Sequence, residues 1–68
     1  MRVYRYLTGV DDAKFCHRVT VALNNGWELY GNPSLTFDAE QGVVICGQAI
    51  VKTAEGKEYV DGMDLSTV

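Results

Sequence analysis

The sequence predicts an α+β domain in which one helix packs on a three- to four-stranded, mainly antiparallel sheet, in the order β-α-β-β. Two observations carry this prediction: one helical period between residues 11 and 25, and alternating strand patterns before and after it. A chain of 68 residues makes one domain at most. We expect residues 1–60 to form that domain and residues 61–68 to be a loosely ordered tail, since uncapped polar ends fray.

The first strand is expected over residues 2–8, which are rich in aromatic and β-branched types. The helix follows, with Thr8 or Asp11 as its cap, and ends at Gly26, which supplies the left-handed residue common at helix ends. The apolar stripe of the helix is expected to face the sheet and consists of Phe15, Cys16, Val19, Ala22 and Leu23.

The second strand begins at the only tryptophan, and alternation places Trp27 and Leu29 against the helix. Pro33 has no N–H for a ladder hydrogen bond, so we expect the chain to bulge, bend or run along a sheet edge there. Residues 34–38 resume the strand pattern, and a hairpin loop follows with Gly42 in a left-handed conformation.

The longest strand is expected over residues 43–52 and is apolar on both faces, which is typical of a central strand. Gly47 within this strand indicates the close approach of an aromatic ring or of another backbone. After a second turn, residues 58–60 are expected to form a short fourth strand.

One helix covers only one face of such a sheet, so the other face needs a partner. We expect Val44, Cys46 and Ile50 to lie on that open face. An exposed apolar face of this kind marks an interaction surface. The sequence therefore predicts a homo-oligomer, a dimer or larger, packed sheet to sheet.

Charge is unevenly distributed along the chain. Residues 1–53 carry five basic and five acidic side chains, whereas residues 54–68 carry one basic and four acidic ones and hold the whole net charge of −3. This pattern lacks the basic footprint of a protein that binds duplex nucleic acid. No apolar run approaches the roughly 18 residues of a membrane span, and no signal core is present, so we expect a cytoplasmic protein without a membrane partner.

The reactive residues form no recognisable catalytic or metal-binding pattern. Cys16 and Cys46 are expected to be buried, reduced thiols, because a free cysteine behaves as a small hydrophobe. With His17 they show no zinc-binding spacing, so we expect no metal and no cofactor. The chain has no nucleophile elbow and no phosphate-binding glycine loop, and we expect no enzyme activity.

Five polar residues are candidates for binding a ligand. Lys14, His17 and Arg18 lie away from the apolar stripe of the helix, where they form either a solvated face or the cationic half of a small anion site. Tyr30 offers a ring for stacking on a partner subunit or on a planar ligand. Gln48, the one amide of the long apolar strand, fixes strand register, bonds across a subunit boundary or reads a ligand.

Four sequence blocks are unusual enough to compare with known proteins: Leu7-Thr8-Gly9, Phe15-Cys16-His17-Arg18-Val19, Gly26-Trp27-Glu28-Leu29-Tyr30-Gly31-Asn32-Pro33 and Ile45-Cys46-Gly47-Gln48-Ala49-Ile50-Val51-Lys52. In this order they resemble a family of small bacterial and phage proteins that is described only as a domain of unknown function. The resemblance covers about residues 4–53 and leaves the remainder outside. It implies a one-helix α+β domain and supplies no catalytic residue.

The sequence thus predicts a non-enzymatic, oligomeric binding module. We expect it to bind or sequester a small anionic or nucleotide-like ligand at its subunit boundaries. Sequestration is included because the resembled family has members in phages. The alternative is an adaptor that docks another protein through the open sheet face or the acidic tail. A third hypothesis, the weakest, is an enzyme without a recognisable motif. It would need a Cys–His pair across an oligomer interface, because Cys16 and His17 are neighbours whose side chains diverge on one helix.

Overall fold

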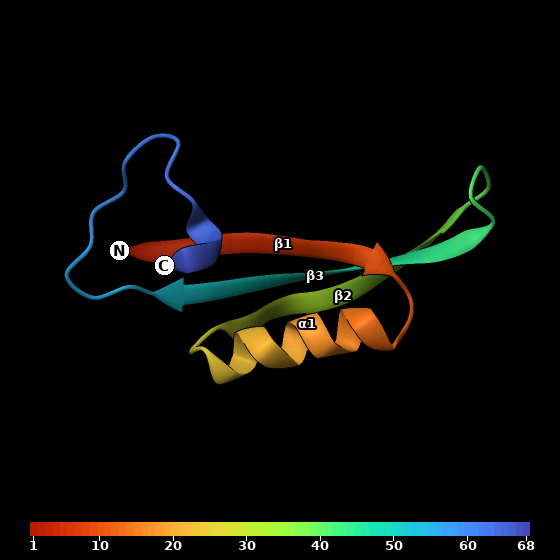
Figure 1. The fold of residues 1–68 in the computed structure, drawn as a ribbon, viewed down its shortest axis with the longest axis horizontal. Helices are drawn as coiled ribbons and strands as arrows, with labels where there is room; N and C mark the ends of the chain where they lie inside the picture. Colours follow the sequence, from red (N-terminus) through yellow and green to blue (C-terminus); the bar gives the residue numbers. More distant parts are fainter.

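Three antiparallel strands and one helix make up the fold (Figure 1). In chain order they are β1 (Arg2–Val10), α1 (Ala13–Asn24), β2 (Glu28–Asp38) and β3 (Val43–Thr53), and a single 3-10 turn follows, η1 (Leu65–Thr67). The computed structural model describes all residues, Met1–Val68. β3 lies in the centre of the sheet and pairs antiparallel with both β1 and β2. The expected α+β class and element order are confirmed with three strands, and residues 58–60 form no strand.

Local chemistry sets both ends of the helix. Asp12 caps α1, because its side-chain Oδ1 accepts from the backbone N–H groups of Lys14 at 3.0 Å and Phe15 at 3.2 Å. The expected cap at Thr8 or Asp11 is wrong, because β1 continues to Val10 and delays the start of the helix. At the other end Gly26 has a φ of 91°, which confirms the left-handed residue expected there.

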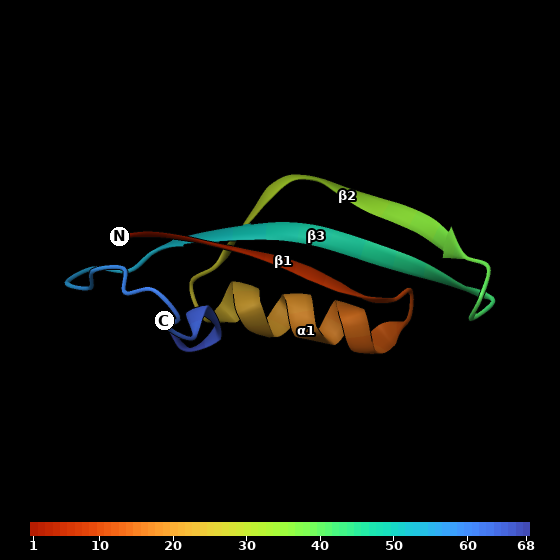
Figure 2. The same cartoon turned by 90° about the horizontal axis from the view of Figure 1, so that it is seen from above.

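The helix lies on one side of the sheet, which we call the inner face; the opposite side is the outer face (Figure 2). Val3 and Leu7 of β1 point to the inner face and are buried. Their register partners in β3 are Lys52 and Gln48, so Cys46 and Ile50 share that face. The prediction that Val44, Cys46 and Ile50 lie on the open face is therefore wrong. β3 is apolar on both sides, so its alternation alone does not distinguish the two orientations.

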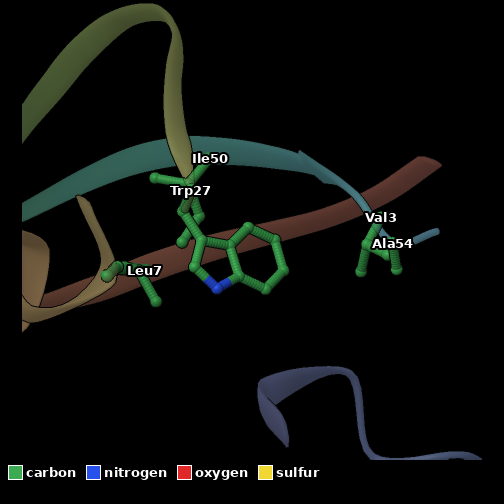
Figure 3. Close-up of a cluster of buried hydrophobic side chains, with 6 residues drawn as sticks. Val3, Leu7, Trp27, Ile50 and Ala54 are labelled. Atoms are coloured by element: carbon green, nitrogen blue, oxygen red, sulfur yellow. The ribbon is translucent and has the colours of Figure 1, made fainter. Parts of the chain in front are cut away.

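The hydrophobic core is small and lies between α1, β1 and β3. Figure 3 shows the Trp27 ring on the inner side of the sheet, with Leu7 to one side and Val3 and Ala54 to the other. Trp27 is only 3% exposed, which agrees with its expected role as a core residue. The buried cluster consists of Val3, Leu7, Ala22, Trp27, Ile50 and Ala54.

β2 departs from the core immediately after Trp27. Its register against β3 shifts between Tyr30 and Ser34, and Figure 2 shows the strand bowing away from α1. This confirms the irregularity expected around Pro33 in an edge strand. Leu29 is 52% exposed, so its expected packing against the helix is wrong. No residue of β2 is buried.

One contact ties all three strands together across the outer face. The Tyr6 ring lies over Gly47, where an added Cβ would stand 2.7 Å from the Tyr6 hydroxyl oxygen. The same hydroxyl is 2.8 Å from the Ser34 Oγ on β2. The expected close approach of an aromatic ring to Gly47 is confirmed, and a side chain there would displace that ring.

The segment after β3 returns to the inner face of the sheet, on the side of α1 (Figure 2). Ala54 extends the pairing of β3 with β1, because its N–H donates to the Met1 carbonyl at 2.7 Å. Further on, η1 contacts β1, and Leu65 and Val68 pack against the core cluster. Residues 61–68, expected to be loosely ordered, thus end in a helical turn docked on the domain.

Candidate functional site

A hollow of about 720 Å³ opens between the C-terminal half of α1, the inner face of β1 and β3, and η1. Four basic side chains line it, and no aspartate or glutamate does. We call it the cationic hollow. Its basic residues are Arg5 from β1, His17 and Arg18 from α1, and Lys52 from β3.

The aromatic wall of the cationic hollow holds two of these basic groups. The guanidinium carbon of Arg5 lies 5.4 Å from the centroid of the Trp27 ring, and the Lys52 Nζ lies 5.7 Å from it. Both distances are within the range of cation–π attraction. Arg5 and Lys52 are therefore held beside the core, half-buried, instead of extending into water.

The helix contributes the other two basic groups. His17 and Arg18 are successive residues on the exposed flank of α1 that faces η1. The Arg18 Nη1 donates to the Thr8 carbonyl at 2.7 Å, which fixes the guanidinium against the end of β1. A guanidinium has five N–H donors, so this contact leaves others free for an anion.

The tail closes one side of the hollow with Ser66, Thr67 and Val68. The Lys52 Nζ donates to the Val68 backbone oxygen at 2.8 Å. The turn is held by the Asp64 carboxylate, which accepts from the Ser66 N–H at 2.9 Å and from the Ser66 hydroxyl at 2.6 Å. These hydrogen bonds, and more weakly the positive charge of Arg5, lower the pKa of Asp64 below its ordinary value of 3.8.

The structure brings together two of the five residues predicted to bind a ligand. His17 and Arg18 line the cationic hollow, while Lys14 lines a neighbouring hollow of about 330 Å³ that shares Arg18. Tyr30 is 60% exposed and pairs with Ala49 on the outer face, away from the helix.

Gln48 is buried, and its side chain hydrogen-bonds to the backbone of the strands around it. Its Nε2 donates to the carbonyls of Tyr30 at 3.2 Å, Gly31 at 3.4 Å and Ala49 at 2.9 Å. The first two carbonyls lie where β2 loses its regular register. Of the three roles considered for this amide, its contacts are those of a residue that fixes the strands.

Arg5 and Lys52 are not among the five residues that the sequence predicts for the site. A signal for them existed: each is the basic residue on the strand face that carries the core, beside Val3 and Leu7 in β1 and beside Ile50 in β3. A charged group on a core-facing strand position is unusual and needs a partner or a solvent-filled space.

The two cysteines are free, and their surroundings differ. Cys46 is buried, as expected; its Sγ lies 3.4 Å from the Gly9 carbonyl. Burial and, to a smaller extent, the negative charge of Asp11 raise the pKa of the Cys46 thiol, which suppresses its reactivity. Cys16 is exposed, so its predicted burial is wrong. No three His, Cys, Asp or Glu side chains are grouped so that they could hold a metal ion.

Comparison with known proteins gives a family and no function. No curated protein and no solved structure matches the chain. None of its helices combines the length and the apolar composition that crossing a membrane requires. A family model, described as a domain of unknown function, matches residues 1–53, which includes all three strands and α1 and excludes the tail. The chain therefore belongs to the DUF1737 family.

Proposed function

We propose that this protein is a non-enzymatic, oligomeric binding module that holds a small anionic ligand in the cationic hollow. The observation that carries the proposal is the convergence of Arg5, His17, Arg18 and Lys52 on a space without any carboxylate side chain in its lining. The cations Arg5, Arg18 and Lys52 repel one another unless an anion lies among them. Binding or sequestering such a ligand requires no catalytic group.

The geometry favours recognition of a phosphate or carboxylate group over stacking of a base. The Trp27 ring is almost fully buried and already lies near Arg5 and Lys52. Guanidinium and ammonium groups match phosphate oxygens, Arg18 in a bidentate manner. The volume of 720 Å³ lies within the ordinary range of small-molecule sites, so the anionic group can belong to a ligand of nucleotide size.

The position of the hollow changes where we place the ligand. The sequence predicts a site at subunit boundaries, whereas the residues of a single chain are enough to line the cationic hollow. We therefore place the ligand within each subunit, beneath η1. Tyr30 and Gln48 take no part in this version of the site.

The only tryptophan gives a direct test, because Trp27 lines the hollow. We expect inorganic phosphate, pyrophosphate or a nucleoside monophosphate to change Trp27 fluorescence in a saturable manner. Replacing Arg18 by Gln should weaken binding about tenfold or more, since a charge-assisted hydrogen bond contributes about 1.5–3 kcal/mol. The matched control is Lys14→Gln, which removes one charge from the same helix outside the hollow.

Two results would contradict the proposal. One is the absence of saturable binding of all three anions at low ionic strength, where electrostatic attraction is strongest. The other is equal weakening by Arg18→Gln and Lys14→Gln, which indicates general charge attraction and no site.

A second candidate function is a protein adaptor that uses the outer face. Its support is the row of exposed tyrosines there: Tyr4 is 54% exposed and Tyr30 is 60% exposed. Tyrosine is enriched in protein interfaces because it combines apolar area with a hydroxyl. Loss of a partner on replacing both residues by serine, with unchanged anion binding, would favour this function.

A further inference from the structure

A second apolar surface lies on the inner side of the hairpin, away from the cationic hollow. Leu35 and Phe37 of β2 pair with Cys46 and Val44 of β3, so all four positions are on the inner face. Leu35 is 67% exposed and Phe37 is 64% exposed, because the β2–β3 hairpin extends past the end of α1 (Figure 1). Large apolar groups in this state indicate a surface that is covered in the functional form.

The surface continues along β2 to the opposite end of the strand and onto one flank of the helix. Leu29 lies on the same face of β2. On α1 the exposed residues Cys16 and Leu23 are seven positions apart, which places them on one side of the helix, and that side is not the one lining the cationic hollow. We call Cys16, Leu23, Leu29, Leu35, Phe37 and Val44 the hairpin face. None of them carries a charge.

The exposed area of the chain exceeds that of an average folded monomer of its mass. A folded monomer of 7.5 kDa exposes about 4,250 Å², whereas this chain exposes 4923 Å². The excess of about 700 Å² is close to the roughly 800 Å² that each partner buries in a standard interface. The radius of gyration agrees: it is 13.6 Å, against about 11 Å for a compact chain of this length.

We propose that two copies of this chain pack their hairpin faces together about a two-fold axis. A second copy is the partner that the chemistry favours, because a row of apolar side chains is best covered by an equally apolar surface, and the same chain supplies it. The outer face fits this role less well. Its large residues Tyr4, Tyr6 and Tyr30 carry hydroxyls that water can solvate, and antiparallel sheets commonly leave one such face in solvent.

This inference specifies the oligomer of the proposed function and rests on that part of it. It is independent of the ligand, because the hairpin face and the cationic hollow share no residue. In the dimer each hollow remains open to solvent, and anion binding should not require assembly.

Phe37→Ser and Tyr30→Ser form a matched pair that tests the proposal. Both change an aromatic residue of β2 that is about equally exposed, 64% and 60%, on opposite faces of the sheet. We expect sedimentation equilibrium of the unmodified chain to give twice its mass of 7.5 kDa. Phe37→Ser should weaken self-association about tenfold or more, as expected for a large aromatic residue in an interface, and Tyr30→Ser should leave it unchanged.

The exposed cysteine gives a second readout within the same experiment. Cys16 belongs to the hairpin face and is covered in the proposed dimer, while Cys46 is buried in either state. Alkylation of Cys16 should therefore be slow in the unmodified chain and in Tyr30→Ser, and fast in Phe37→Ser.

The outcomes separate this proposal from the ligand proposal. A monomeric unmodified chain, or dissociation by Tyr30→Ser and not by Phe37→Ser, would overturn the hairpin-face dimer. Saturable anion binding to monomeric Phe37→Ser would still support the cationic hollow. Loss of anion binding in a chain that remains dimeric would refute the hollow and leave the dimer standing.

Discussion

β1 and β2 are the two neighbours of the same central strand, yet only one of them belongs to the core. Both pair antiparallel with β3, and both carry large apolar residues on the inner face. Val3 and Leu7 of β1 are buried, whereas no residue of β2 is. The difference teaches that strand pairing does not by itself remove a side chain from water, because a covering layer must also lie over it.

The covering layer is present over β1 and absent over most of β2. The buried cluster joins Ala22 of α1 to β1 and β3, and η1 adds a second piece over β1 (Figure 2). β2 is shifted by the bulge between Tyr30 and Ser34, and Gln48 holds the bulge by donating to the Tyr30 and Gly31 carbonyls. The bulge in β2, which the buried Gln48 side chain holds in place, is therefore the reason why β1 and β2 differ in burial.

Replacing Trp27 is the change with the largest expected effect, because Trp27 joins the β2 side of the chain to the core. Trp27→Ala should reduce the free energy of unfolding by about 3–5 kcal/mol, the usual range for truncating a large buried aromatic. A small domain has little stability to spare, so the variant should be largely unfolded by circular dichroism. Tyr4→Ala, at an exposed aromatic of β1, is the control and should remain folded. A folded Trp27→Ala chain with an unchanged melting temperature would contradict the core described above.

Truncating two register partners, one buried and one exposed, tests directly how much the covering layer contributes to stability. Ile50 of β3 and Leu29 of β2 lie opposite each other, with exposures of 0% and 52%. In urea unfolding, Ile50→Ala should lower the free energy of unfolding by about 2–5 kcal/mol, and Leu29→Ala should lower it by about 1 kcal/mol or less. The measurement belongs in the monomeric Phe37→Ser background, where self-association does not contribute. Equal losses at the two positions would show that β2 is covered within the single chain.

Acid should loosen η1, the turn that lies over β1, and should leave β2 unaffected. This is the smallest of the expected effects. The folded pKa of Asp64 is below 3.8, so the folded chain binds fewer protons there than the unfolded chain. Its stabilisation is present above pH 3.8 and is lost as the pH falls through the lowered pKa. Amide exchange of Ser66 and Thr67 should therefore show less protection in that acid range, relative to the same amides at pH 6.

Asp64→Asn is the control for the acid effect. It removes the titrating group, so the acid-induced loss of protection at Ser66 should disappear. An identical loss in Asp64→Asn would assign the effect to another carboxyl group. Protection that is already absent at pH 6 would agree with the loosely ordered tail that the sequence predicts.

The functional residues divide between those that sequence patterns indicate and those that only packing assembles. His17 and Arg18 stand out in the sequence as basic residues on the polar side of an amphipathic helix. Arg5 and Lys52 are 47 positions apart and meet only because β1 pairs with β3 beside Trp27. Each is recognisable as a basic residue on a core-facing strand position, but no local pattern shows that the two meet, and the closure of the hollow by η1 leaves no local pattern either.

The sequence by itself determined the elements and their order. Gly26 ends the helix, Pro33 accompanies the irregularity of β2, and a strand that is apolar on both sides became the central one. These are local effects of backbone conformation and side-chain period. Only the tertiary structure decided which face of β3 the helix covers. β1 and β2 run parallel to each other with β3 between them, so α1 is a crossover connection. Crossover connections have a preferred handedness, and this handedness selects the face that α1 covers. The alternation of β3 does not.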